Sequence, residues 1–180
     1  MRRWLYRILV TLALAAVFHI LTVMALPRAM MVAFSWKGKD LGQRSNVLYH
    51  GPRVTADSRT VVRPSPDLLY SACAYDVSKA PLRISALVPD TYWSLSFFAS
   101  NTDNFFVIND RQVKTNPVDI LLVGPGMSYK NPGNAQVITS TSDRGVAIIR
   151  ILITDEGRIE ELTKVQRQAP CSPVDQGLGS

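Results

Sequence analysis

The most pronounced pattern along the chain is an uninterrupted hydrophobic run near its start. The run from Ile8 to Leu26 contains no Asp, Glu, Lys or Arg. A helix rises about 1.5 Å per residue, so a run of this length would span roughly 28 Å, close to the hydrocarbon thickness of a bilayer. Backbone amides in lipid must bond within their own segment, which favours a helix. The pattern predicts a transmembrane helix over residues 8–26, with Pro27 favouring its end.

Charges around this run set its expected orientation. Arg2, Arg3 and Arg7 precede the run, and Arg28 alone follows it closely, so residues 1–7 are predicted to be a basic cytoplasmic tail. The rest of the chain would then be periplasmic, held at a bacterial inner membrane by one pass. The alternative is a cleaved signal peptide. Signal peptides have a shorter apolar core and a small-x-small cleavage site, so an uncleaved signal-anchor is the preferred interpretation.

Residues 27–60 are expected to form a juxtamembrane or edge segment. Residues 29–36 are apolar and are followed by Lys37 and Lys39. One interpretation is an interfacial stretch lying against the membrane, with Trp36 at headgroup depth. The other is an ordinary first strand or linker helix, and the sequence does not decide between them.

After residue 60, hydrophobic residues recur with period two and are separated by clusters of Pro, Gly, Asn and Asp. This alternation is typical of half-buried β-strands. No helical pattern lies between the runs, which argues against an α/β fold. We therefore predict a mainly β fold, an antiparallel β-sandwich or jelly-roll-like domain over residues 61–168. The expected strands are Leu68–Asp76, Leu82–Val88, Tyr92–Ala99, Phe105–Asn109, Asp119–Val123, Ala135–Ser140 and Val146–Ile153.

One helix is expected near the end of the chain. In residues 155–168, Ile159, Leu162 and Val165 recur at three-residue steps and would share one face. Acidic residues at the start and basic residues at the end of this segment suit the helix dipole. Residues 169–180 contain prolines and glycines and are predicted to be an irregular tail.

The formal net charge of +6 owes much to the basic flank of the hydrophobic run. The remainder has no dense block of Lys and Arg, so a nucleic-acid partner is not expected.

The two cysteines are Cys73, in a predicted strand, and Cys171, in the tail. In an oxidising periplasm such a pair is read as a disulfide. The alternative is a buried free Cys73 and an exposed Cys171.

The sequence contains no recognisable catalytic set. Metal ligands at standard spacing are absent, so neither a metal site nor a cofactor is predicted, and no G-x-S-x-G motif accompanies His50, the histidine outside the hydrophobic run. Polar residues that could bind a ligand concentrate at Asn101, Asp103, Asn104 and Arg111. The competing interpretation for them is turn residues at strand ends. A second cluster contains Asp67 and Tyr70, for which the alternative is an Arg–Asp pair bracing a turn.

The order of the motifs resembles the domain-of-unknown-function family numbered 1254 over about residues 61–168. The residues that carry the resemblance are Arg63-Pro-Ser-Pro-Asp67-Leu-Leu-Tyr70-Ser71, Asp76, Pro81, Val88-Pro89-Asp90, Tyr92-Trp93-Ser94-Leu95, Asn101-Thr-Asp-Asn104-Phe105-Phe106, Leu121-Leu-Val-Gly124-Pro125-Gly126 and Arg144–Ile151. The resemblance implies a β-rich, jelly-roll-like fold but no settled activity. This chain departs from the family pattern where many relatives have Asn-Arg-Asp before Leu-Tyr-Ser and Trp after Gly-Pro-Gly.

The resemblance also implies a partner. Larger members of the family carry a second domain, numbered 1214, in the same chain. The present chain resembles a short, membrane-anchored version whose companion domain would be a separate membrane protein.

A ligand groove is predicted to be lined by Asp67, Tyr70, Trp93, Asn104 and Gly126.

These features define three functional hypotheses. The preferred one is a non-enzymatic binding module of the cell envelope. The alternative is an envelope enzyme, hydrolase-like and metal-assisted, that would use Asp67, Tyr70, Asp103 and Arg111. The third is a structural subunit that pairs with the companion domain. The binding or structural module ranks first because catalysis needs clusters of titratable groups that the sequence lacks.

Overall fold

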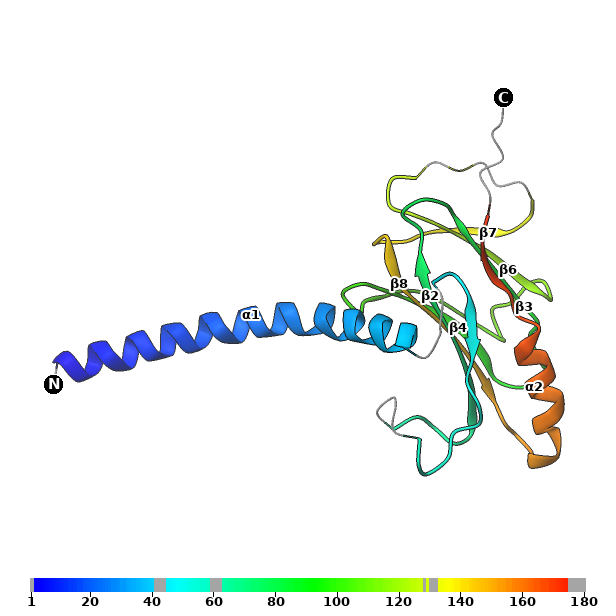
Figure 1. The fold of residues 1–180 in the computed structure, drawn as a ribbon, viewed down its shortest axis with the longest axis horizontal. Coiled ribbons are helices and arrows are strands. Elements are labelled where there is room, and N and C mark those ends of the chain that lie inside the picture. The colour runs from blue at the N-terminus through cyan, green and yellow to red at the C-terminus, as the bar shows by residue number, and fades with distance from the viewer. Residues whose placement is uncertain (1, 41–44, 59–62, 128, 130–132, 175–180) are drawn as a thin grey trace.

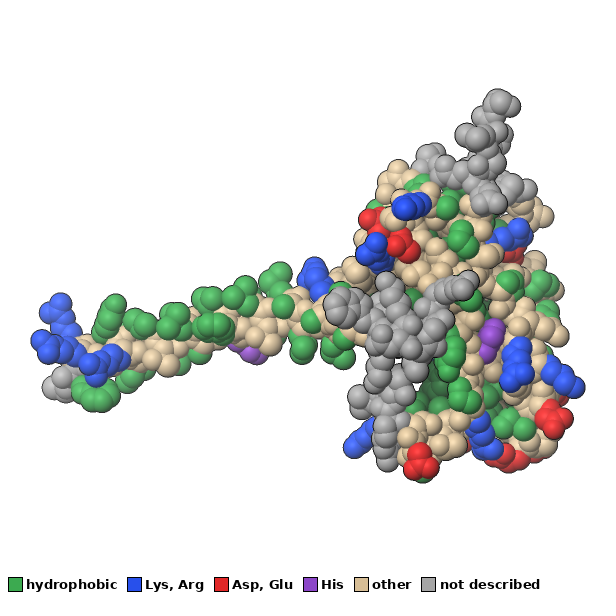
Figure 2. Space-filling model, viewed as in Figure 1, with side chains coloured by type: hydrophobic (Ala, Val, Ile, Leu, Met, Phe, Trp, Pro, Cys, Tyr) green, Lys and Arg blue, Asp and Glu red, His purple; other side chains and the backbone are tan. Residues whose placement is uncertain are grey.

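A computed structural model of the chain describes residues 2–40, 45–58, 63–127, 129 and 133–174. The first element, α1, runs from Arg2 to Asp40 and projects from a β-rich domain (Figure 1). Its stretch from Arg2 to Ala33 is long and apolar enough to cross a membrane and is not buried against the domain. Hydrophobic side chains lie along much of the visible apolar stretch of this helix, with basic side chains at its N-terminal end (Figure 2). The helix therefore fits a single-pass membrane anchor.

The expected end of the helix at Pro27 is wrong, because α1 continues through this residue to Asp40. A proline inside a helix lacks the N–H that would bond to the carbonyl four residues earlier. The next residue contributes an additional bond, since the guanidinium of Arg28 donates to the carbonyl oxygen of Met24 at 2.8 Å. Alanine and methionine, which follow, are good helix formers. Of the interpretations left open for residues 29–36, a strand is thus excluded.

The domain is built from two sheets, and the predicted mainly β, largely antiparallel fold is confirmed. The five-stranded sheet has the order β1-β2-β8-β4-β5 and the four-stranded sheet the order β7-β6-β3-β9. The strands are β1 Leu48–His50, β2 Leu68–Asp76, β3 Leu82–Ala86, β4 Trp93–Ala99, β5 Asn104–Asn109, β6 Val118–Val123, β7 Gln136–Thr139, β8 Arg144–Leu152 and β9 Cys171–Pro173.

Three details differ from the expectation. β7 pairs with β6 in parallel rather than antiparallel. β1 is a short strand within the segment expected to wrap the domain edge, and it does form that edge by pairing with β2. The described start of the tail is not irregular, because β9 pairs with β3. Residues 175–180 of the predicted tail lie outside the described residues.

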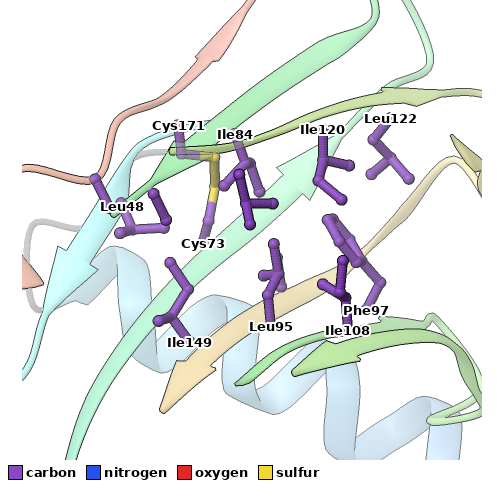
Figure 3. Packing of buried hydrophobic residues seen from close by; sticks show 14 of the residues in the cluster. Leu48, Cys73, Ile84, Leu95, Phe97, Ile108, Ile120, Leu122, Ile149 and Cys171 are labelled. Atoms are coloured by element: carbon purple, nitrogen blue, oxygen red, sulfur yellow. A yellow bond between two sulfur atoms is a disulfide. The ribbon is translucent and has the colours of Figure 1, made fainter. Parts of the chain in front are cut away.

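The core lies between the two sheets and follows from the alternation along the strands. In β2, Leu69, Ser71, Cys73 and Tyr75 are buried, while the residues between them are half-buried. Figure 3 shows side chains from both sheets pointing toward one another across this space. The largest fully buried side chain is Trp93, at the start of β4.

A disulfide joins the two sheets near one side of the sandwich. It links Cys73 on β2 to Cys171 on β9, across a sequence separation of 98 residues (Figure 3). In the chain-entropy model, closing a loop of this length stabilises the folded state by about 4–5 kcal/mol. The bond holds β9, which is only three residues long, against the core.

The predicted C-terminal helix is confirmed in shortened form. A 3-10 turn, η1, covers Glu156–Arg158 and is capped by the Asp155 side chain, which accepts the N–H of Gly157. The helix α2 then covers Ile159–Arg167. Its Leu162 is buried in the core, and Gln166 Nε2 donates to the carbonyl oxygens of Tyr70 at 2.9 Å and Gly51 at 3.4 Å. These bonds tie the helix to the β1–β2 edge.

The packing at the start of β8 makes a testable prediction about Gly145. A Cβ added there would lie 2.1 Å from the carbonyl oxygen of Phe98 and 2.3 Å from Tyr75 Oη. We expect Gly145→Ala to lower the free energy of unfolding by about 3 kcal/mol, because backbone and a buried ring would have to move.

Urea unfolding of the detergent-solubilised protein, followed by tryptophan fluorescence, measures the effect. The matched control is Gly133→Ala, where an added Cβ meets nothing within 4 Å, so a change within about 0.5 kcal/mol is expected. Equal losses in the two variants would contradict the strand packing described here.

Candidate functional site

The residues predicted to line one groove are distributed over different parts of the domain. Asp67 and Tyr70 lie where β2 begins. The Asp67 side chain is exposed. The backbone carbonyl oxygen of Asp67 accepts the N–H of Ile153 at 2.8 Å. The Tyr70 hydroxyl accepts the N–H of Ser65 at 3.1 Å. Both residues thus hold the turn that leads into β2.

Trp93 does not line a groove, because its side chain is 0% exposed and lies between the sheets. The indole Nε1 has no hydrogen-bond partner among the described residues. A buried N–H without an acceptor costs free energy that the packing of the ring must offset. Trp93 therefore packs as a core residue in this structure.

Asn101 and Asp103 lie at the other end of β4, in the turn that leads into β5, and Asn104 is the first residue of β5. Asn101 Nδ2 donates to Asp103 Oδ2 at 2.5 Å, and the carbonyl oxygen of Asp103 accepts the N–H of Ala99 at 2.9 Å. Thr102 between them has a φ of 71°. The hydrogen bonds of Asn101 and Asp103 are those of a polar tight turn.

Arg111 and Gly126 lie in two further turns. The Arg111 side chain is exposed after β5, and its backbone N–H donates to Asn109 Oδ1 at 3.1 Å. Gly126 follows β6 with a φ of 70°, a conformation that glycine adopts without steric cost. The structure therefore does not bring the eight predicted residues into one cavity. Their individual roles in binding stay predictions.

His50 and Ser71 form a hydrogen-bonded pair that sequence analysis did not anticipate. The His50 Nδ1 lies 2.9 Å from Ser71 Oγ, a separation at which an imidazole can activate a hydroxyl. Ser71, however, is only 1% exposed, so a substrate cannot reach its hydroxyl. Burial, and secondly the positive charge of Arg167, lower the pKa of His50 below its usual value of 6.5. A neutral imidazole bonded to a buried hydroxyl is a structural arrangement.

A cleft of about 490 Å³ opens on the side of the sandwich opposite the disulfide, between edge strand β5 and strands β6 and β7. Its size is in the usual range of small-molecule sites. The residues that line it are Phe106, Val107, Ile108, Gln112, Lys114, Thr115, Val118, Asp119, Asn134 and Gln136.

The two walls of this cleft differ in chemistry. β5 supplies an apolar wall, which contains the half-buried Phe106 and the core residue Ile108. The opposite wall carries amides, a hydroxyl and two charges. The carboxylate of Asp119 pairs with Arg83, with the shorter N···O distance at 2.5 Å. Among the described side chains, the ammonium group of Lys114 has no carboxylate partner. The cleft can therefore accept an apolar body together with a polar or anionic group.

The free edge of β5 is short. The N–H of Asp110 donates to the carbonyl oxygen of Trp93 at 3.0 Å, so by the antiparallel alternation Val107 and Asn109 direct their backbone groups away from β4. Asn109 is capped, since its N–H donates to Gln112 Oε1 and its carbonyl oxygen accepts the Gln112 N–H. A register shift interrupts the ladder near Phe98. These features protect the edge against pairing with a further strand.

Sequence analysis missed the cleft because its residues come from three strands and two connections. The available signal was the run of Gln112, Lys114 and Thr115 directly after a predicted strand, which read as a turn. The described residues contain no group of three or more His, Cys, Asp or Glu side chains that could hold a metal ion.

Fold and site together define a class of protein: a β-sandwich with an open cleft at one side, joined to a helix long enough to span a membrane. The family model described as "Protein of unknown function (DUF1254)" matches residues 45–173. The chain belongs to this family. The resemblance noted in the sequence is thereby confirmed. No curated protein matches the chain.

Two solved structures are similar to the chain. The VPA0106 protein of Vibrio parahaemolyticus has a TM-score of 0.66 at 14% identity, covering 86% of this chain and 36% of that one. An uncharacterised protein of Burkholderia cenocepacia has a TM-score of 0.49 at 15% identity, covering 85% of this chain and 39% of that one. The first likeness supports the fold. The chain spans little more than a third of the length of these solved proteins.

The lowered pKa of His50 predicts how stability changes with pH. The unfolded chain takes up a proton near pH 6.5, whereas the folded chain does so only at lower pH, so the unfolded state binds more protons between these values. The stability that His50 contributes is therefore fully present above its unfolded-state pKa of 6.5 and is lost as the pH falls through its lower folded-state pKa.

Urea unfolding at a series of pH values tests this expectation. In His50→Gln the dependence over this window should flatten, because glutamine does not titrate there. Asp76 and Asp90 have carboxyl groups with lowered pKa values. These groups take up protons at a lower pH than the range over which His50 acts, so they do not obscure the effect of His50. An unchanged pH dependence in the variant would disprove the assignment to His50.

Proposed function

We propose that this chain is a single-pass membrane protein whose β-domain acts as a non-enzymatic binding module of the cell envelope. The observation that carries the proposal is the cleft beside β5, a cavity of ligand size lined by one apolar and one polar wall. The apolar helix α1 would hold this cleft near a membrane surface. Nothing among the described residues favours the alternative of a metal-assisted hydrolase.

The domain is proposed to be periplasmic, at a bacterial inner membrane. Three arginines, Arg2, Arg3 and Arg7, precede the apolar run and only Arg28 closely follows it, which favours a cytoplasmic N-terminus. The disulfide between Cys73 and Cys171 supports the same orientation, because such bonds persist in oxidising compartments and are rare in the cytosol.

The proposed ligand has an apolar part and an anionic or polar group. The apolar part would lie along Phe106 and Ile108, where burial removes hydrocarbon surface from water. The anionic group would lie near Lys114, whose ammonium is the charge in the cleft without a carboxylate partner among the described side chains. Gln112, Asn134 and Gln136 would supply hydrogen bonds.

A protein partner is part of the proposal as well. The solved relative from Vibrio parahaemolyticus is much longer than this chain, so the same fold occurs there beside further polypeptide. For the present chain, a companion domain of the family numbered 1214 is proposed as a separate membrane protein. The exposed polar turns that contain Asp67, Asp103 and Arg111 would be contact points for it.

The cleft makes a prediction that native mass spectrometry of the full-length protein can check. We expect protein purified from membranes in mild detergent to carry a small molecule bound one to one. Gln136→Trp should remove it, because Gln136 pairs with the core residue Ile120 and so faces the cleft, which a large ring there would fill. Gln136 is exposed, so the fold should tolerate the change.

Val137→Trp is the matched control for this experiment. Val137 is the next residue on β7 and is 45% exposed, but it does not line the cleft. It should retain the bound molecule. The same adduct on all three proteins, or none on any, would remove the cleft as the binding site.

The topology is tested separately with reporters fused after Ser180. We expect alkaline phosphatase to be active and green fluorescent protein to be dark, because only the outer compartment supports that pattern. The full-length protein should also stay in the membrane after carbonate washing. The reverse reporter pattern would overturn the proposed orientation while leaving the cleft untouched.

A further inference from the structure

The polar side chains of the apolar run lie on one side of α1. Between Ile8 and Leu26 these side chains are Thr11, His19 and Thr22. The run is helical throughout. Because a helix turns about 100° per residue, the three side chains fall within about 80° of one another around the axis. Ala15 lies at the centre of this arc. These four residues are called the polar face of α1 below.

The opposite side of the same helix is aliphatic. It presents Ala13, Val17, Ile20 and Met24, which are centred about 180° from Ala15 around the axis. Hydrocarbon chains of lipid pack well against such side chains, but they offer no hydrogen bond to a hydroxyl or an imidazole. The two sides of α1 therefore favour different neighbours, lipid on the aliphatic side and another protein helix on the polar face.

His19 is the residue of the polar face that most needs a partner. It lies two positions from the middle of the run, about 12 Å from the nearer edge of the hydrocarbon, which an imidazole cannot span. The side chain is exposed and has no hydrogen-bond partner among the described residues. The domain does not cover it, because α1 projects away from the domain (Figure 1). An unpaired polar group in lipid is unfavourable, so this position favours a partner on a neighbouring helix.

A second copy of the chain supplies partners of the right kind. Copies inserted in the same orientation pair around a two-fold axis along the membrane normal, so each residue of the contact meets its own counterpart. Such a contact needs side chains that bond to their own kind. A neutral imidazole carries one N–H donor and one acceptor nitrogen, and a hydroxyl also donates and accepts, whereas like charges repel each other. His19 and the two threonines of the polar face have this property.

We propose that the polar face of α1 joins two copies of this chain into a parallel dimer within the membrane. The two His19 imidazoles would bond to each other across the axis. Ala15 is small, so the two backbones can approach closely there. The hydroxyl of Thr22 donates to the carbonyl oxygen of Phe18 at 2.8 Å, and its oxygen can still accept a bond from the other copy. The proposal rests on the membrane-spanning role proposed for α1 and uses no residue of the cleft.

Disulfide cross-linking of the full-length protein in its membrane tests which side of α1 forms the contact. Cys73 and Cys171 are paired with each other, so one introduced cysteine is the reactive thiol. Ala15→Cys, at the centre of the polar face, should form a cross-linked dimer on mild oxidation. Ala13→Cys is the matched control, because the substitution and the depth are similar but the position lies about 160° away around the axis. Its cross-linked fraction should be severalfold lower, since a disulfide forms only between neighbouring Cβ atoms.

Sedimentation equilibrium of the full-length protein in maltoside micelles tests the part played by His19. His19→Leu should raise the dissociation constant of the dimer by about threefold to tenfold, because a hydrogen bond between helices is lost. Leucine favours membrane insertion, so the helix should remain in place. His19→Gln is the control that keeps a donor and an acceptor, and its dissociation constant should stay within about twofold of the wild type.

Several results would contradict the dimer. These are equal cross-linking at positions 13 and 15, no cross-linking at either, or an unchanged dissociation constant in His19→Leu. Cross-linking of Ala15→Cys to a different protein would also contradict it, because the partner would not be a second copy. Carbonate washing separates this proposal from the proposed topology. A monomer that stays in the membrane contradicts the dimer alone, whereas a protein that washes off contradicts both.

Discussion

The pairing of β8 with β2 on one side and with β4 on the other is the constraint on which the domain depends. Its register decides, residue by residue, which side chains enter the core and which face outward. Ala147, Ile149 and Ile151 thereby meet the four-stranded sheet, while Arg150 is left on the outer face. A shift of one residue would exchange the two sets, and the buried side chains make such a shift unfavourable.

The two sides of the sandwich are closed to different degrees. On one side the disulfide between Cys73 and Cys171 joins the sheets, and α2 is tied to the β1–β2 edge through Gln166. On the other side β5 faces β6 and β7 across the cleft, with Gln112 capping the strand edge. The sandwich is therefore closed covalently on one side and open at the cleft on the other.

The fold was largely predictable because its signals are local. The apolar run required a lipid-compatible helix, and the alternation in β2, β4 and β8 required half-buried strands. The features missed are those whose stability comes from distant partners. β1 and β9 are three residues long and exist because β2 and β3 supply hydrogen-bond partners. The continuation of α1 through Pro27 also escaped prediction, since proline alone argues for an end.

The candidate site was not predictable in the same way. Asp67, Asn104 and Gly126 were predicted to line one groove, yet the sheet topology places their segments in different parts of the domain. By itself the sequence determined the membrane-compatible helix, the β-rich class and the family, since these depend on the period and order of residues along the chain. Only the tertiary structure decided that Phe106 and Lys114 line a cleft and that His50 lies beside Ser71. The physical reason is that a site depends on which strands become neighbours, and neighbours are set by packing among residues far apart in the chain.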